Sequence, residues 1–202
     1  MNTKIREAPM YDILFSYIQQ FNSVPITADE KERYRAAFSP FKLRRKQYFL
    51  QEGNRCHSFA FIIKGAMRQF TIDEKGAEHI VRLGIENWWM GDRESYVMNT
   101  PSVYNIDAWE NTEMLLLSRQ HALDLSTIPS FSYMLHRLDE KNNMANQRRI
   151  TAAISASAEK RYREFAACYP DLLDRFPQHI IASYLGFTKD TLSRLKNKHV
   201  KE

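Results

Sequence analysis

The stretch that decides the fold is Pro177–Lys198, PQHIIASYLGFTKDTLSRLKNK. Apolar side chains recur at helical spacing before Gly186, and glycine accepts the left-handed conformation that ends helices. A second helix is predicted to begin at Thr188, because threonine is a good N-cap and Asp190 then faces the positive end of the helix dipole. The leucines of this second helix supply its buried side. The stretch therefore predicts two short helices joined by a tight glycine turn.

The other side of the second helix is basic. From Thr188 to Glu202 there are five Lys or Arg against two acids, a net charge of +3. Two short helices, a glycine turn and a basic second helix are typical of a helix-turn-helix, whose second helix enters the major groove of DNA. Lys and Arg neutralise phosphates, and Arg can make a two-pronged contact with guanine. The alternative is a helical hairpin whose basic face is merely solvated, since motif matches misfire.

The DNA-contacting residues can be assigned from this arrangement. We expect the start of the first helix to meet backbone phosphate and the second helix to face the major groove. An acid in the second helix can accept a hydrogen bond from the cytosine amine. The predicted DNA-binding residues are Gln178, His179, Thr188, Lys189, Asp190, Ser193, Arg194 and Lys198.

The composition agrees with a nucleic-acid partner without proving one. The chain has 202 residues, 44% of them hydrophobic, and its formal net charge is 29 − 24 = +5. Cys56 and Cys168 lie far apart, which fits ordinary thiols in a reducing cytoplasm. No apolar run approaches the ~20 residues that span a bilayer, and the N-terminus lacks the apolar core of a signal peptide. We expect a cytoplasmic protein that does not bind a membrane.

The segment from Phe41 to about Ser118 has a hydrophobic period near two and recurring turn residues. About eight short strands with regular turns favour a barrel or a jelly-roll-like sandwich. Two helices are predicted before it. The first covers residues 9–22, and a capping box at Thr27–Glu30 starts the second, which runs to about Phe38.

A long helix is predicted after the strands, from about Ser130 to Ser155. Its length would be ~39 Å at 1.5 Å per residue. Its apolar side needs a partner, either the β domain of the same chain or a second copy. Asn142 near this side could set the register between two copies, as buried Asn does in coiled coils.

Two C-terminal segments, HIIASYLGFTKDTLSRLKNK and SAEKRYREFAACYPDLLDRFPQHIIASYLG, resemble the Crp/Fnr family of bacterial transcription regulators. FIIKGAMRQF, with Gly65 at its turn, resembles the β-roll of that family. The resemblance covers about Phe41 to Lys198. It implies an α+β fold with a jelly-roll-like β-roll sensor domain and flanking helices (1–128), a long dimerisation helix (129–156) and a helix-turn-helix domain (157–202).

The resemblance also implies two departures from the family pattern. Only His199–Glu202 follow the second motif helix, where many members carry a β-hairpin wing, so a reduced wing is expected. The sugar and phosphate of a cyclic nucleotide would fall near Gly91 and Asp92, where Asp replaces the usual Glu. The family's phosphate-binding Arg falls on Ser102 or its neighbours, which include no cation. Burying a phosphodiester without a counter-charge costs several kcal/mol.

The effector is therefore expected to be something other than cyclic AMP, or absent. A less charged ligand could occupy a pocket lined by aromatic side chains, or the two tryptophans could simply belong to the core. The candidate effector-binding residues are Trp88, Trp89, Gly91, Asp92, Arg93, Ser102 and Val103.

No catalytic motif such as GxSxG, HExxH or a P-loop occurs, so no enzyme, catalytic residue or cofactor is predicted. Two distant cysteines cannot supply an iron–sulfur site. His136, Asp139 and Glu140 form a thin metal-site candidate that solvated helix polarity explains better, so no metal site is predicted. The sequence predicts a homodimeric transcription regulator that reads palindromic double-stranded DNA, with half-sites about 34 Å apart. The alternative is a module that binds a cyclic nucleotide or metabolite and signals through protein contacts.

Overall fold

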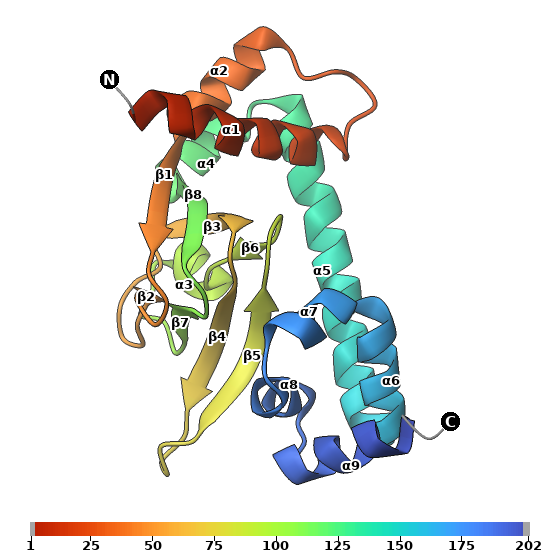
Figure 1. Ribbon diagram of the computed structural model, residues 1–202. Helices are drawn as coiled ribbons and strands as arrows, with labels where there is room; N and C mark the ends of the chain where they lie inside the picture. Colours follow the sequence, from red (N-terminus) through yellow and green to blue (C-terminus); the bar gives the residue numbers. More distant parts are fainter. Residues whose placement is uncertain (1–2, 200–202) are drawn as a thin grey trace. The chain divides into compact units, whose positions relative to one another are not determined.

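The computed structural model describes the backbone of residues 3–199 and the side chains of residues 8–188 and 190–195. It forms two compact units, each described here by itself (Figure 1). The first comprises residues 1–69 and 84–140, and the second comprises residues 70–83 and 141–202. No helix of the described part of the chain is long and apolar enough to cross a membrane.

Two helices open the first unit, α1 (Thr3–Gln19) and α2 (Ala28–Ala37). The sequence placed the start of the first helix at about residue 9, and it begins earlier, with Pro9 inside. The predicted capping box is confirmed. The Thr27 hydroxyl accepts a hydrogen bond from the Glu30 amide at 3.2 Å, and the Glu30 carboxylate accepts one from the Thr27 amide at 2.8 Å.

Eight strands in two sheets confirm the predicted jelly-roll-like arrangement and the α+β class, and the sheets do not close into a barrel. The first sheet has the order β1-β8-β3-β6 and the second β2-β7-β4-β5. Their bounds are β1 (Phe38–Leu43), β2 (Tyr48–Leu50), β3 (Ser58–Lys64), β4 (Met67–Ile72), β5 (Glu78–Gly84), β6 (Trp89–Met90), β7 (Asn105–Ala108) and β8 (Thr112–Ser118).

Strand β1 begins directly after α2, three residues before the predicted start at Phe41. The Phe38 amide donates to the Tyr34 carbonyl and so caps α2, while Phe38 itself pairs with Leu117 of β8. Pro40 lies inside this strand. That is possible because β1 is the edge of its sheet, and a proline there removes no hydrogen bond that the sheet needs.

The core of the first unit joins the helices to the first sheet through aromatic side chains. Phe38 and Phe61 pack against Trp89, with ring centres 6.0 and 5.1 Å away. Leu14 of α1 is fully buried in the same cluster. A fully buried side chain of this size contributes about 1.5–3 kcal/mol.

Two further helices belong to the first unit, and a third, α5, has residues in both units. Helix α3 (Arg93–Met98) connects β6 to β7, and α4 (Arg119–Leu125), which the sequence did not predict, follows β8. Helix α5 (Pro129–Ser155) confirms the predicted long helix. The residues at its start are buried, and most of those after Lys141 are exposed.

The second unit holds the end of β4, most of β5 and the C-terminal helices. These helices are α6 (Ala158–Cys168), α7 (Pro170–Arg175), α8 (Gln178–Leu185) and α9 (Lys189–His199). Ser157 caps α6 by accepting a hydrogen bond from the Lys160 amide at 3.2 Å. The expectation of a reduced wing concerns residues that follow α9 and lie outside the described residues.

Candidate functional site: nucleic-acid interface and sensor region

Helices α8 and α9 meet at the predicted glycine turn. Gly186 has φ 72°, in the left-handed region. Its amide donates to the Ser183 carbonyl at 3.1 Å, and the Phe187 amide donates to the Ala182 carbonyl at 2.8 Å. This pair of hydrogen bonds is a Schellman motif, which satisfies carbonyls at the end of a helix. The Thr188 hydroxyl then accepts from the Thr191 amide at 3.2 Å and caps α9.

The two helices bury their apolar sides and expose their polar ones. Leu192 is only 1% exposed, and Ile180 and Ile181 are equally well buried. On the polar side, Asp190 and Arg194 are exposed, and no described residue forms a hydrogen bond or ion pair with either. Their charged groups are therefore available to a ligand.

The structure places the other predicted DNA-binding residues on the same two helices and at the turn. Gln178 and His179 are exposed at the start of α8. Thr188 is exposed, and Ser193 is half-buried. The side chains of Lys189 and Lys198 lie outside the described residues.

Arg161 of α6 holds the turn from behind. Its Nη1 donates to the Leu185 carbonyl at 3.0 Å, and its guanidinium carbon lies 4.4 Å from the centre of the Phe187 ring. Its described contacts are with the turn itself.

Strand β5 contacts α8 within the second unit. The Ser183 hydroxyl accepts from the Ile80 amide at 3.0 Å and donates to the Glu78 carbonyl at 3.3 Å. Arg149 of α5 donates to the Val81 carbonyl at 2.6 Å, and its guanidinium carbon lies 4.2 Å from the centre of the Tyr184 ring. Sequence reasoning missed these contacts, because a serine and an arginine on helices normally indicate solvated positions.

In the first unit, several of the predicted effector residues make contacts within the fold. A Cβ on Gly91 would lie 2.7 Å from the Phe59 ring, so packing against Phe59 requires glycine there. Asp92 is 4% exposed. Its carboxylate accepts from the Glu94 amide at 3.1 Å and the Ser95 amide at 3.3 Å, and so caps α3.

The remaining polar members of the predicted effector set also have partners in the protein. Arg93 forms an ion pair with Asp139 of α5 through both terminal nitrogens, and its Nη2 lies 2.7 Å from Asp139 Oδ2. The Ser102 hydroxyl accepts from the Tyr104 amide at 3.0 Å within its own turn. The carboxylate of Asp139, one of the three residues of the metal-site candidate, is therefore paired with Arg93. No group of three or more His, Cys, Asp or Glu within the described residues could hold a metal ion.

The apolar members of the set divide between core and surface. Trp89 is 6% exposed and belongs to the core cluster, whereas Val103 is 60% exposed. Trp88 is half-buried. None of the seven predicted effector residues lines the pocket found in this unit.

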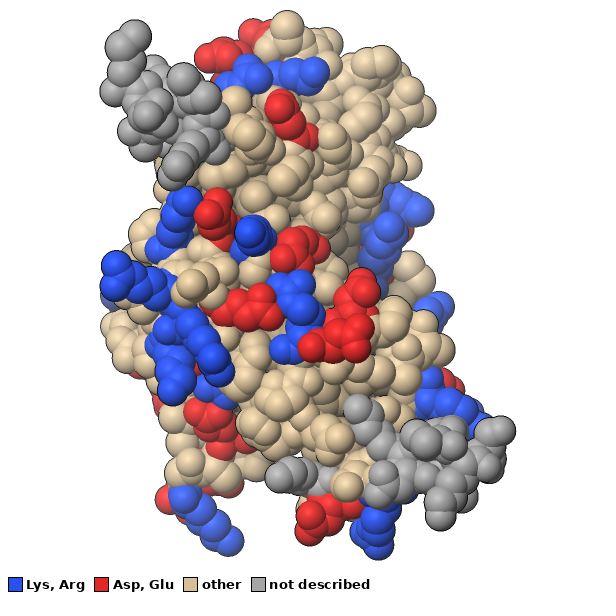
Figure 2. All heavy atoms as spheres, viewed as in Figure 1, with Lys and Arg blue, Asp and Glu red and all other residues tan. Residues whose placement is uncertain are grey.

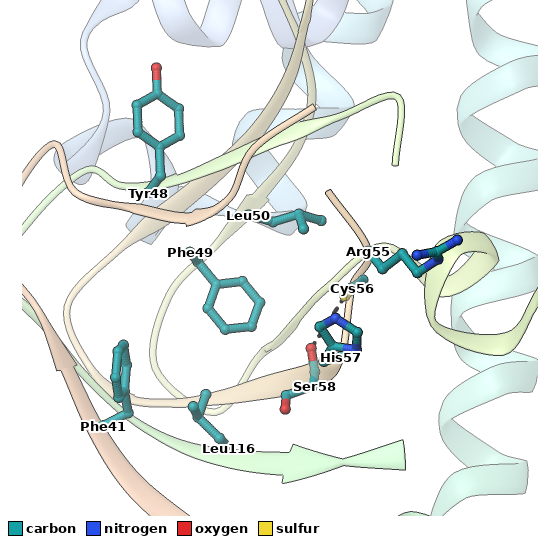
Figure 3. Close-up of a pocket in the computed structure, with 9 residues that line it drawn as sticks. All are labelled: Phe41, Tyr48, Phe49, Leu50, Arg55, Cys56, His57, Ser58 and Leu116. Carbon is teal, nitrogen blue, oxygen red and sulfur yellow. Dashed lines mark hydrogen bonds between the residues drawn. The ribbon is translucent and has the colours of Figure 1, made fainter. Parts of the chain in front are cut away.

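That pocket lies elsewhere and encloses about 230 Å³ (Figure 3). Figure 3 shows Arg55 extended away from the aromatic side chains, and its Nε donates to the Asn99 carbonyl at 2.8 Å. Burial raises the pKa of the Cys56 thiol, which donates to the Ser58 carbonyl at 3.3 Å. The described lining residues include no acid and are Phe41, Tyr48, Phe49, Leu50, Arg55, Cys56, His57, Ser58 and Leu116.

Burial also acts on a tyrosine beside α3. The Tyr96 ring packs against Phe59 with a centre-to-centre distance of 4.9 Å. Its hydroxyl is buried without a hydrogen-bond partner among the described residues. This burial, with a smaller effect from Cys56, raises the pKa of Tyr96 to about 12. The hydroxyl therefore stays protonated at neutral pH and brings no charge to this corner.

Charges of both signs are mixed on the face drawn in Figure 2. A group of Lys and Arg lies over the connection between β1 and β2, where Arg44, Arg45 and Lys46 follow one another. Arg45 lies 5.6 Å from the centre of the Trp109 ring. Acidic groups lie beside the basic ones on this face.

The cyclic nucleotide-binding domain family matches residues 40–127. FixK2 from Bradyrhizobium japonicum superposes with a TM-score of 0.70 at 16% identity, over 81% of this chain and 85% of that one. The chain therefore shares the fold of FixK2. A CooA mutant from Carboxydothermus hydrogenoformans gives a TM-score of 0.65 at 19% identity, over 91% of this chain and 83% of that one.

A further structure with this fold is CLP, described as a c-di-GMP responsive global regulator of Xanthomonas campestris. It gives a TM-score of 0.65 at 12% identity, over 87% of this chain and 92% of that one. No curated protein sequence matches the chain. The comparisons therefore show the fold and a match of residues 40–127 to the cyclic nucleotide-binding domain family, and the structural neighbours are Crp/Fnr-family transcription regulators.

Proposed function

We propose that this protein is a DNA-binding transcription regulator that acts as a homodimer on a palindromic double-stranded site. The observation that carries the proposal is the polarity of α9. Leu192 is buried against the other helices, while Asp190 and Arg194 are exposed and have no described partner in the protein. A helix with this division can enter the major groove without giving up interactions that hold the fold.

The chemistry of the exposed groups suits base edges and phosphates. Arg194 can donate two hydrogen bonds to guanine, and Asp190 can accept one from the cytosine amine. Gln178 and His179 begin α8, where helix amides and the dipole favour a phosphate. Lys189 and Lys198 would add charge for phosphate contacts.

Helix α5 supports the assignment of a second copy as partner. Beyond Lys141 it exposes Met144, Ile150 and Ile154, the last at 82%. At ~100° per residue these three side chains fall within an arc of about 120° on one side of the helix. An apolar side of this kind on a long helix is suited to pairing with its own copy. We propose the 129–156 segment as the dimerisation helix between a sensor domain (1–128) and a DNA-binding domain (157–202).

For the sensor, we propose an effector other than cyclic AMP, or none. The carboxylate of Asp92 caps α3, and the guanidinium of Arg93 is paired with Asp139. Neither group is available to the sugar or phosphate of a nucleotide unless an internal contact is broken. An uncompensated phosphate would be poorly bound there.

The decisive experiment is selection of bound sequences from a random duplex pool, with and without cyclic AMP and cyclic GMP. We expect a palindromic consensus that does not depend on either nucleotide. Recovery of no enriched sequence under any condition would contradict the DNA-binding proposal. If calorimetry then showed nucleotide binding, the protein would instead be a signalling module that acts through protein contacts.

A further inference from the structure

Arg161 contacts three consecutive residues at the turn between α8 and α9. Its Nη1 donates to the carbonyl of Leu185, the last residue of α8, at 3.0 Å. The last carbonyls of a helix have no partner within the helix and carry partial negative charge, so a cation is well placed there. The same nitrogen would lie 3.7 Å from a Cβ added at Gly186, so the guanidinium covers the open side of that glycine.

The third contact is with Phe187, whose ring lies against the guanidinium at 4.4 Å. A flat guanidinium can lie over an aromatic ring and donate a hydrogen bond from its edge at the same time, which an ammonium group cannot do. Phe187 directly precedes Thr188, the residue that caps α9. One side chain therefore contacts the end of α8 and the residue that leads into α9.

We propose that Arg161 is a positioning residue for DNA recognition. It fixes the turn between α8 and α9, and so the direction in which α9 presents Asp190 and Arg194, without touching DNA itself. The proposal rests on the DNA-binding function proposed above. The affinity for DNA then depends on the hydrogen bond from Arg161 to Leu185 and on its contact with the Phe187 ring.

Burial separates this role from a phosphate contact. Arg161 is half-buried, and its Nε is shielded from solvent without a hydrogen-bond partner in the described residues. A cation that binds phosphate must reach the surface. Arg163, two residues further along α6, is exposed. It supplies a matched control with the same charge on the same helix.

The test uses Arg161→Lys, Arg161→Met and Arg163→Met in the full-length protein, with a duplex selected by the wild type. The dissociation constant is measured at ~50, ~100 and ~200 mM salt. We expect both Arg161 variants to bind about tenfold more weakly, because a displaced Arg194 loses part of its two-pronged base contact. The slope of log K against log salt should stay at the wild-type value. Arg163→Met should change affinity less than either Arg161 variant.

The second part of the test needs no DNA. It compares the rates of amide hydrogen exchange in the free wild-type and variant proteins. Exchange at Gly186 and Phe187 should be faster in both Arg161 variants and unchanged in Arg163→Met. Exchange at Ile62, buried in the first unit, reports whether the variants keep the fold.

Three results would overturn the proposal. Wild-type affinity in Arg161→Lys would show that charge alone matters, and a salt slope smaller by about 0.9 in Arg161→Met would show a phosphate contact. Unchanged exchange at the turn would show that Arg161 does not hold it. Failure of the wild type to bind any duplex would defeat the proposed function, and the exchange arm would still decide whether Arg161 fixes the turn.

Discussion

The α8–α9 region and the β6–α3 corner carry similar polar residues, and the protein uses them in opposite ways. At α9, Asp190 and Arg194 are exposed with no described partner in the protein. At α3, Asp92 is buried as a helix cap and Arg93 is paired with Asp139. One aspartate and one arginine are thus available to a ligand in the first region, and the corresponding pair is occupied by the fold in the second.

This difference separates binding from stability. A polar group already bonded inside the protein contributes to the free energy of unfolding, and its removal costs more than removal of a solvated group. A solvated group contributes little to stability, so its removal should lower the affinity for a ligand and leave the free energy of unfolding nearly unchanged. Substitutions in the two regions should therefore have opposite signatures.

The largest effect is expected for Arg194→Ala. Loss of a two-pronged guanine contact should weaken binding to the selected duplex by ~1–3 kcal/mol, roughly 5- to 150-fold. The free energy of unfolding should change by less than about 0.5 kcal/mol, because Arg194 is a solvated surface residue. Fluorescence anisotropy and urea unfolding measure the two quantities. A large loss of stability with unchanged affinity would reverse the comparison.

Asp92→Ala should show the opposite pattern. Loss of an N-cap costs about 0.5–2 kcal/mol, and the unfolding free energy should fall by that amount. Asp92→Asn is the matched control, since asparagine caps a helix about as well as aspartate. Urea unfolding of the two variants checks this expectation. Equal destabilisation by both variants would mean that the negative charge, rather than the cap, is what the site needs.

A smaller effect is expected when Glu30, whose carboxylate is hydrogen-bonded within the fold, becomes protonated at low pH. Burial favours the neutral form of Glu30, but hydrogen bonds from Ser130 and Thr27 outweigh it and leave its pKa below the ordinary value. Because the pKa is lowered by folding, the stabilisation is present above the unfolded value of about 4.3 and is lost as pH falls through the folded value.

The corresponding variant is Glu30→Gln, measured by urea unfolding across pH 7 to pH 3, a range of about four units around the unfolded pKa. Wild type should be more stable than the variant at neutral pH, and the difference should shrink as the medium becomes acidic. A difference that is constant with pH would show that the charge of Glu30 does not contribute.

The smallest effect is expected for Arg93→Gln. The Arg93–Asp139 ion pair is partly exposed, with 66% of the arginine side chain accessible, and such pairs are worth about 0–1 kcal/mol. Hydrogen bonding to Asp139 raises the pKa of Arg93, so its charge persists across the accessible pH range. The unfolding free energy should fall only slightly. Titration calorimetry should detect no cyclic AMP binding by wild type or variant, and nucleotide binding by the wild type would show that Arg93 can leave Asp139.

The parts that the sequence predicted well are those governed by local rules. Gly186 ends α8 in the left-handed conformation, and Thr188 caps α9, because both depend on a few neighbouring residues. The capping box at Thr27 and Glu30 is local in the same way. The alternation of apolar and polar residues from Phe41 onward predicted about eight strands. This alternation is a property of each strand and does not depend on which strand it pairs with.

The parts that could not be predicted depend on residues distant in sequence. Arg93 and Asp139 are 46 positions apart, and Ser183 meets Ile80 across 103. Neither pairing leaves a signal in its own neighbourhood. Strand β6 has only two residues, which are too few to show a period. Arg161 and Leu185 are 24 positions apart, so their contact leaves no local signal either.

Strand β5 lies at one end of its sheet, and such a strand normally offers unpaired backbone groups to any other chain. Here the Ser183 hydroxyl occupies the Ile80 amide and the Glu78 carbonyl. Loss of α8 from this position would leave that edge open to intermolecular strand addition. Partial unfolding of the C-terminal helices should therefore promote aggregation, so α8 also protects the sheet from self-association.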